Sequence, residues 1–112
     1  MNFKLVNNKI NKLIKSGKVN PNIGTAMKSV PVIIESVNEH AKTHGITLEQ
    51  AQIFVNNSEI MFNQGNRNMY LSNDGSATVI IENKRLISAY GKELFNPGII
   101  AILEVIENVR RK

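Results

Sequence analysis

Residues 68–90 constrain the fold most, because they divide into short strand-like runs separated by tight-turn signals. β-Branched, aromatic and other apolar side chains fill these runs, which is typical of strands. Asn73-Asp74-Gly75 predicts a three-residue hairpin loop with a left-handed glycine, and Asn83-Lys84 predicts a two-residue loop. The predicted strands are 59–63, 68–72, 77–82 and 86–90. We therefore expect an antiparallel meander of three to four strands.

These loop lengths also predict which side chains share a face of the sheet, because successive residues of a strand point to opposite faces. The expected core face carries Met69, Leu71, Val79, Ile81 and Leu86. The expected opposite face carries Asn68, Tyr70, Thr78, Ile80, Glu82 and Arg85. Arg67, Ser88 and Tyr90 have the parity of the core face in this register. We therefore expect them to reach substrate only near the strand ends, where a cleft opens.

Apolar residues at helical spacing predict helices before and after the meander. The first helix covers 3–14, with lysines between its apolar positions, and Ser16-Gly17 ends it. Residues 19–25, with Asn-Pro-Asn and a glycine, predict a loop. Asn96-Pro97 supplies a cap and a first-turn proline for a C-terminal helix over 96–110.

Two further helices are predicted between the first helix and the meander. Pro31 fits the first turn of a helix that continues to His44-Gly45, where the glycine is the C-terminal cap. Thr47-Leu48-Glu49-Gln50 matches a capping box and begins a helix that ends at Asn56-Asn57. The expected fold is thus one α+β domain over 1–112. Its parts are a mainly helical segment 1–57, an antiparallel sheet in 58–91 and a C-terminal helix.

The chain has 112 residues, no cysteine and a net charge of +5. Its length suffices for one core without disulfides, and the lack of cysteine excludes a disulfide scaffold, Cys-based zinc sites and a Cys nucleophile. Basic residues gather in 4–28 and 110–112, whereas acids outnumber bases between Glu35 and Val109. This distribution suits a polyanion such as RNA or an acidic protein partner. Solvated lysines on an amphipathic helix are the alternative explanation of the N-terminal run.

No apolar run approaches the roughly 18 residues that span a bilayer. The N-terminus also lacks the apolar block of a signal peptide. We therefore expect no membrane insertion by this domain. If the domain is secreted, we expect its export signal on a longer parent protein.

His40 and His44 lie four residues apart, which places them on one face of the predicted second helix. Three interpretations are open. A histidine in the last turn complements the negative end of the helix dipole. The spacing also suits zinc, but the sequence offers no third Cys or His and no HExxH glutamate, so we expect no metal. The third is acid–base catalysis, in which the pair takes a proton from a ribose 2′-hydroxyl and delivers one to the leaving 5′-oxygen.

RNA cleavage of this kind also needs cations on the phosphate. Arg67, Lys84 and Arg85 lie at predicted strand ends or in a turn and are candidates for that role. Ordinary surface charge is the alternative, and it fits Lys84 and Arg85 better than Arg67. Ser88 and Tyr90 also have a plain alternative, as a half-buried strand residue and a core-edge aromatic.

The Ser88-Ala89-Tyr90 strand end, placed after a helical half with two histidines, resembles the barnase, EndoU and colicin-type (BECR) ribonuclease toxin domains. The resemblance covers about residues 35–91. It implies a catalytic set of His40, His44, Arg67, Ser88 and Tyr90. Ser88 and Tyr90 would then orient or stabilise the phosphate. The resemblance also implies a lysine in the catalytic set, for which Lys28 and Lys84 are the candidates. The expected substrate-binding residues are Lys28, Lys84 and Arg85.

The same resemblance implies a biological setting. Such domains are often the toxic C-terminal tips of large secreted proteins used in contact-dependent competition between bacteria. They cut tRNA or other RNA in the target cytoplasm without a cofactor, and a cognate immunity protein neutralises them. Opposite a basic toxin we expect that partner to be acidic. The leading alternative is a non-catalytic basic α+β module that binds nucleic acid or protein.

Overall fold

The structure, a computed structural model, describes residues 1–111. Within them lie three α-helices and one six-stranded mixed sheet, so the α+β class is confirmed. In chain order the elements are α1 (Phe3–Lys15), the 3₁₀ turn η1 (Pro21–Ile23), β1 (Thr25–Lys28), β2 (Ser36–Lys42), α2 (Leu48–Asn57), β3 (Ile60–Gln64), β4 (Arg67–Leu71), β5 (Ala77–Glu82), β6 (Arg85–Gly91), the 3₁₀ turn η2 (Lys92–Leu94) and α3 (Pro97–Arg110). The strand order is β1-β3-β4-β5-β6-β2, with β2 parallel to β6 and the other neighbours antiparallel.

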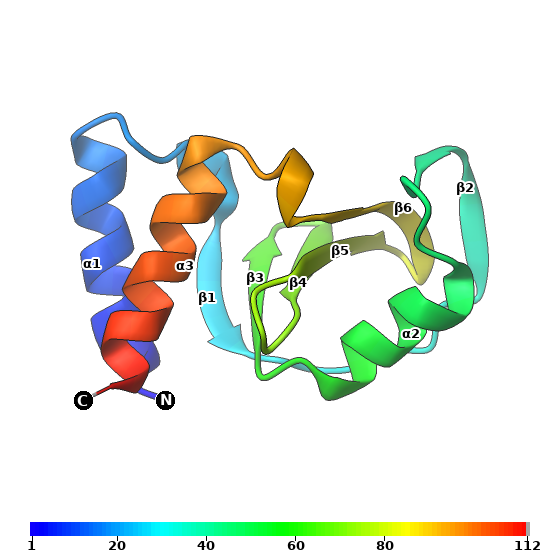
Figure 1. Cartoon of the computed structure of the whole chain (residues 1–112), viewed down its shortest axis with the longest axis horizontal. Helices are drawn as coiled ribbons and strands as arrows, with labels where there is room; N and C mark the ends of the chain where they lie inside the picture. The colour runs from blue at the N-terminus through cyan, green and yellow to red at the C-terminus, as the bar shows by residue number, and fades with distance from the viewer. Residues whose placement is uncertain (112) are drawn as a thin grey trace.

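Both faces of the sheet carry an apolar core. Helices α1 and α3 lie side by side against one face, and α2 packs on the other (Figure 1). The cluster under α1 and α3 includes Ile10, Phe62, Met69, Leu71 and Ile102. The cluster under α2 includes Val55, Met61, Tyr70, Val79 and Leu86. Adjacent residues of β3 and β4 therefore enter opposite cores, as the pleat of a strand requires.

The predicted first, third and C-terminal helices are confirmed, each with its predicted start. Asn2 caps α1 by accepting the Leu5 N–H, although its role as cap was not predicted. Thr47 and Gln50 form both hydrogen bonds of the capping box that begins α2. Asn96 accepts the Ile99 N–H at the start of α3. The caps of α2 and α3 depend on local chemistry alone, which explains why the sequence identifies them.

The predicted helix from Pro31 to His44 is wrong. Residues 29–35 form neither helix nor strand, and β2 follows them as the parallel neighbour of β6. The Tyr70 hydroxyl donates to Val30 O at 2.7 Å, and the Gln52 side chain bonds both Val32 O and Ile34 N. These contacts hold the segment over the α2 core. The overlooked signal is a series of β-branched residues, Val30, Val32, Ile33 and Ile34, which favours extended backbone.

The register of the first hairpin also differs from the prediction. Ser72 N donates to Ala77 O, so the loop has four residues, 73–76, rather than three, although Gly75 is left-handed as predicted with φ 73°. Met69 therefore lies opposite Ile80, and Tyr70 lies opposite Val79. Tyr70, expected on the open face, is 1% exposed because that face carries the α2 core. A one-residue change of register exchanges the faces of a strand.

The second hairpin has the predicted two-residue loop. Asn83 and Lys84 both have positive φ, which gives a type I′ turn. Beyond it the ladder pairs Ile81 with Leu86 but Ile80 with Ser88, so Ile87 is the extra residue of a β-bulge. The bulge turns Ser88 away from the face of Leu86. Without it, Ser88 and Tyr90 would point into the α2 core.

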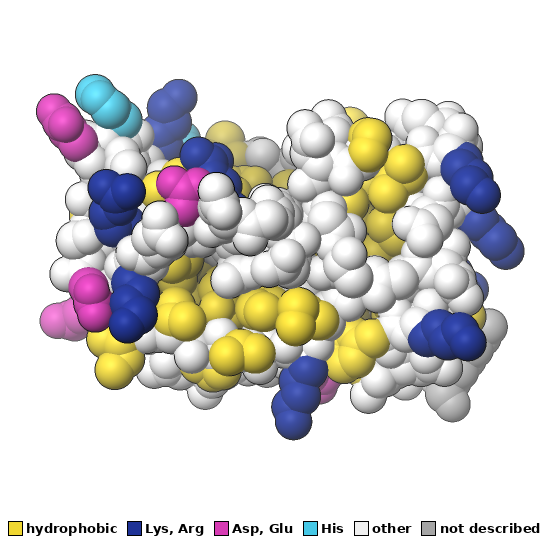
Figure 2. All heavy atoms as spheres, turned by 180° about the vertical axis from the view of Figure 1, so that it is seen from behind, with side chains coloured by type: hydrophobic (Ala, Val, Ile, Leu, Met, Phe, Trp, Pro, Cys, Tyr) yellow, Lys and Arg dark blue, Asp and Glu magenta, His cyan; other side chains and the backbone are white. Residues whose placement is uncertain are grey.

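The two edges of the sheet differ. At β1, the Asn7 side chain of α1 donates to Ala26 O at 2.9 Å and accepts from Ala26 N at 2.8 Å, which covers the edge. At β2, the pairing with β6 is irregular, because five steps from Val37 to Lys42 face two steps of β6. Apolar side chains also form a band on the back of the molecule (Figure 2). Exposed apolar residues include Val30 and Ile33 before β2, Val37 in β2 and Ile53 in α2.

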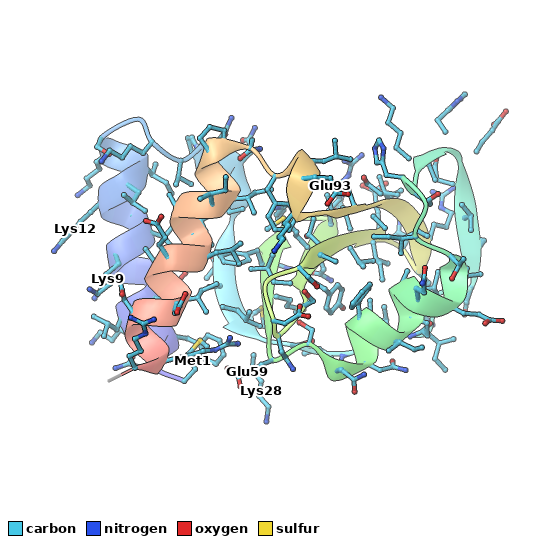
Figure 3. The ribbon with its side chains drawn as sticks, in the orientation of Figure 1. Met1, Lys9, Lys12, Lys28, Glu59 and Glu93 are labelled. Atoms are coloured by element: carbon cyan, nitrogen blue, oxygen red, sulfur yellow. The ribbon has the colours of Figure 1, made fainter. Side chains whose placement is uncertain are left out.

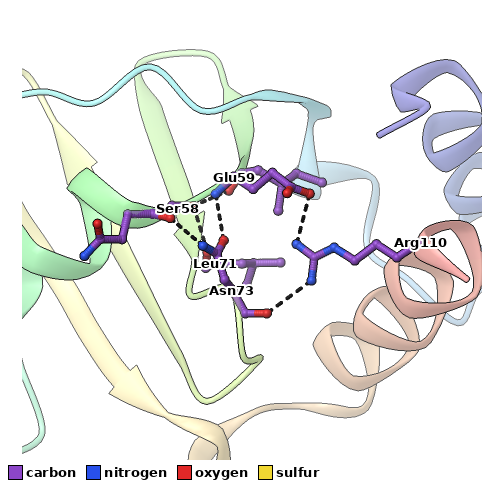
Figure 4. A network of polar contacts seen from close by, with 7 residues as sticks. Ser58, Glu59, Leu71, Asn73 and Arg110 are labelled. Carbon is purple, nitrogen blue, oxygen red and sulfur yellow. Dashed lines mark hydrogen bonds and ion pairs between the residues drawn. The ribbon is translucent and has the colours of Figure 1, made fainter.

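A polar network joins α3 to the sheet. Arg110 donates to Asn73 O at 3.1 Å and to the Glu59 carboxylate at 3.2 Å (Figure 4). The Asn73 side chain accepts from Glu59 N and donates to Asn57 O. Ser58 donates to carbonyl oxygens of β3 and β4. The network thus holds the first hairpin loop between α2 and α3.

Among residues 1–111 no helix is long and apolar enough to cross a membrane.

Candidate functional site

His44 occupies a tight turn that follows β2. Ile46 N donates to Thr43 O at 2.8 Å, and His44 and Gly45 have φ values of 45° and 83°. Two positive φ values at the centre of such a turn define type I′. Left-handed backbone is costly for most residues other than glycine, asparagine and aspartate. His44 is thus held in an unusual conformation, of the kind that often clusters at functional sites.

Tyr90 is the neighbour of His44 near the end of β6. The two rings meet edge to face, with centroids 6.3 Å apart and planes at 89°. On its other side Tyr90 contacts Phe95 in the same manner, with centroids 5.8 Å apart. Burial raises the pKa of the Tyr90 phenol above its usual value. The phenol is therefore neutral at physiological pH and can donate a hydrogen bond.

Ser88 lies two residues before Tyr90 and faces the same side of the sheet. Its hydroxyl donates to the carbonyl oxygen of Lys42 at 3.2 Å, and Lys42 is its partner across the β2–β6 ladder. This contact ties the end of β2 to β6 just before the turn that carries His44. Ser88 is therefore placed to position the His44 turn.

Glu93 lies just beyond the end of β6, in η2, and is solvent-exposed. A Cβ built on Gly91 would lie 2.7 and 2.8 Å from the Glu93 carboxylate oxygens, so this carboxylate folds back onto the residue that follows Tyr90. Because successive strand residues point to opposite faces, the carboxylate lies on the other face of β6 from the Tyr90 ring. Glu93 therefore does not join His44 and Tyr90.

A pocket of about 220 Å³ opens beside Tyr90, on the face covered by α1 and α3. Its floor is apolar and includes Met69, Ile80 and Ile102. Its polar lining consists of carboxamide side chains, those of Asn20, Asn22, Gln64 and Asn96. Tyr90 therefore lies between this pocket and His44.

The structure separates His40 from this site. His40 lies on β2 and not on a helix, so the predicted shared helical face with His44 is wrong. Its side chain is exposed, and its backbone N–H donates to the Asn38 side chain in the irregular part of β2. The helix-dipole explanation of His44 fails for the same reason, because no helix ends there.

The predicted cations are also elsewhere. Arg67 shares the face of Tyr90, but it lies on β4, separated from β2 by β5 and β6, and pairs with Glu82 at 3.2 Å. Lys84 and Arg85 lie at the opposite end of β6 from Tyr90, where Lys84 is 3.6 Å from Glu35. Lys28 ends β1 at the far edge of the sheet, and Figure 3 shows it at the bottom of the view, whereas Glu93 lies in the upper part. The structure therefore brings together His44, Ser88 and Tyr90 alone from the predicted set.

A metal site and a second cavity are weaker candidates for the functional site. In residues 1–111 no three His, Cys, Asp or Glu side chains gather as a metal site would require. A larger cavity of about 420 Å³ lies between the first hairpin loop and α3. Its charged groups are already engaged, Asp74 with Ser72 and Ser76, and Arg110 with Glu59. The contacts of Asp74 and Arg110 therefore stabilise the first hairpin loop and its attachment to α3, and Figure 4 shows those of Arg110.

The pocket, the strained His44 turn and the aromatic contact define the candidate site. Comparisons of the chain with protein-family models, curated proteins and solved structures find no match.

Proposed function

We propose that this protein is a metal-independent endoribonuclease that cleaves RNA, including tRNA, by acid–base catalysis. The observation that carries the proposal is the contact between His44 and Tyr90 beside a pocket at the end of β6. An imidazole that titrates near neutral pH is the side chain best suited to move a proton in this reaction. The resemblance of the pattern to BECR toxin domains supports the same reaction.

The reaction assigned to the site is an internal transfer. The ribose 2′-oxygen forms a bond to phosphorus while the bond from phosphorus to the 5′-oxygen breaks, which leaves a 2′,3′-cyclic phosphate. The His44 imidazole takes the 2′-hydroxyl proton and then gives a proton to the departing 5′-oxygen. Neutral Tyr90 donates a hydrogen bond to a phosphate oxygen, where charge develops. In this scheme His44 performs both proton transfers, and His40 takes no part.

The setting of the proposal is bacterial competition. The chain acts as the toxic part of a larger secreted protein, in the cytoplasm of the target cell, and an acidic immunity protein neutralises it. The net charge of +5 supports both an RNA substrate and an acidic inhibitor. Induced expression in a bacterium is expected to arrest growth, and the His44→Asn variant is expected to relieve the arrest.

The decisive test is cleavage of total bacterial RNA in EDTA, followed on a denaturing gel. His44→Asn is the informative variant, since asparagine tolerates the left-handed backbone that His44 adopts. We expect it to reduce cleavage by about 100-fold or more. His40→Asn is the matched control and should retain activity, because His40 is exposed on the edge strand. Cleavage unchanged in folded His44→Asn would overturn the assignment.

A non-catalytic nucleic-acid-binding module is the second candidate, and the surface of α1 favours it. Lys9 and Lys12 project outward from α1, away from the sheet (Figure 3). Within residues 1–111 none of the α1 lysines forms an ion pair. Such a module predicts salt-sensitive RNA binding without any cleaved product, in wild type and His44→Asn alike.

A further inference from the structure

We infer that the pocket beside Tyr90 binds one nucleobase of the RNA, and that its carboxamides set the base preference. The inference rests on the proposed function, since the pocket shares Tyr90 with the reacting groups. It adds a substrate subsite and residues that lie outside the proposed catalytic set.

The size of the pocket fits a single ring system. Drug-sized ligands occupy roughly 300–1,000 Å³, whereas this pocket has about 220 Å³. Its apolar floor includes Ile99 together with Met69, Ile80 and Ile102, which belong to or pack against the core under α1 and α3. An apolar floor with an aromatic ring at one side suits a planar heterocycle. A free phosphate or a sugar would gain little from such a surface.

The polar lining supplies the groups that read base edges. Asn20 and Asn96 already use their side-chain oxygens to cap η1 and α3, so their amide nitrogens are the groups left for a ligand. The side chains of Asn22 and Gln64 form no hydrogen bond with any residue in 1–111. Carboxamides offer both donors and an acceptor, which is the chemistry that recognises base edges. No charged side chain among residues 1–111 lines the pocket, which favours an uncharged group over a phosphate.

The location connects the pocket to the scissile bond. Tyr90 lines the pocket and contacts His44, so a base in the pocket would place its own ribose and phosphate near the imidazole. Gly98 belongs to the same rim, where a Cβ would lie 3.1 Å from the Asn96 Oδ1. The lack of a side chain there lets α3 approach the Lys18 and Val19 backbone without pressing on the Asn96 cap.

The test is a titration of the ¹⁵N-labelled whole chain with each of the four 3′-nucleoside monophosphates, followed by NMR. Ribose 5-phosphate is the probe that separates base binding from phosphate binding. We expect at least one nucleotide to shift the backbone signals of Asn22, Gln64 and Ile80, and ribose 5-phosphate to leave them unchanged. Equal shifts with ribose 5-phosphate, or no shifts with any nucleotide, would overturn the inference.

Variants test the carboxamides directly. Asn22→Ala and Gln64→Ala are each expected to weaken nucleotide binding by about two- to tenfold, the effect of one hydrogen bond. Asn11→Ala, which removes an exposed amide on α1, is the matched control and should bind normally. Gln64→Glu keeps the size of the side chain but removes its donor, so it should change the order of preference among the four nucleotides. An unchanged order and affinity in all pocket variants would contradict the assignment.

The outcomes separate this inference from the proposed function. Cleavage that depends on His44, without nucleotide binding in the pocket, would leave the ribonuclease standing and remove the base site. Nucleotide binding in the pocket without any RNA cleavage would support the base site but not the ribonuclease, and the protein would then be a nucleic-acid-binding module.

Discussion

The His44 imidazole meets the Tyr90 phenol ring edge to face, with centroids 6.3 Å apart and planes at 89°. Phe95 packs against the same phenol ring at 82°. Tyr90 is therefore fixed by aromatic contacts on two sides, and its hydroxyl makes no hydrogen bond to the described part of the chain. The ring belongs to the packing, while the hydroxyl is available to a substrate.

Tyr90→Phe is expected to preserve the fold and to impair cleavage. Phenylalanine keeps both ring contacts but removes the donor proposed to stabilise the phosphate, which should reduce the rate by about 100-fold. Initial rates on a single purified RNA and circular dichroism of the variant check this. Tyr70→Phe is the control: it loses the bond to Val30 O and about 1 kcal/mol of stability but should cleave normally below its unfolding temperature. Full activity of Tyr90→Phe would remove the hydroxyl from the mechanism.

Lys84→Gly is expected to stabilise the protein. Lys84 has φ 61° in the type I′ turn after Asn83, and Asn-Gly is the preferred pair for this turn. Relief of left-handed strain should contribute about 1 kcal/mol. The exposed contact between Lys84 and Glu35 contributes little. Urea unfolding checks the gain, and Lys84→Gln isolates the loss of charge. A glycine variant no more stable than the glutamine variant would contradict the strain argument.

Gly24→Ala is expected to destabilise the fold strongly. An added Cβ would lie 1.9 Å from Asn63 O, a backbone atom of the neighbouring strand, and the residue has φ 80°. Either the β1–β3 pair separates or the backbone shifts, at a cost of about 3 kcal/mol or more. Gly17→Ala is the matched control, because Gly17 has φ 81° but no atom within 4 Å of its Cβ position. Unfolding midpoints should differ clearly between the two variants, and equal midpoints would disprove the steric cause.

The stability of the protein is expected to depend on pH through Asp74. Hydrogen bonds from Ser76 and Ser72 hold the pKa of this carboxyl below its usual value of 3.8. Its contribution is therefore fully present above that value and is lost as the pH falls through the lower folded-state pKa. Urea unfolding of wild type and Asp74→Asn at pH 6 and pH 3 checks this. The difference in stability should shrink at pH 3, and a constant difference would exclude the linkage.

The α1 lysines are expected to contact the RNA backbone. Each phosphate contact with a single strand contributes roughly 0.7 to the slope of log affinity against log salt concentration. Replacing Lys9, Lys12 and Lys15 by glutamine should therefore reduce that slope by about 2. Binding is measured with His44→Asn, so that cleavage does not interfere. An unchanged slope would place the RNA on another surface, and Lys84→Gln serves as the single-charge control.

The candidate site was only partly predictable. His44, Ser88 and Tyr90 were identified from the sequence, and the structure brings them together. His40 was paired with His44 through a helix that does not form, because β2 pairs with β6 more than 40 residues later in the chain. The pocket carboxamides carry no motif, and their arrangement depends on turns that meet only in the folded chain.

Elements with local signals could be predicted from the amino-acid sequence. The caps of α2 and α3, the end of α1 and the Asn83-Lys84 turn follow from side chains that bond or strain their own backbone within a few residues. Long-range packing, by contrast, sets the four-residue loop 73–76, the strand β2 and the bulge at Ile87. Each of these changes the face or the partner of a strand. These registers and pairings allow two apolar cores to be buried at once, on opposite faces of one sheet. No short segment of the sequence contains the residues of both cores.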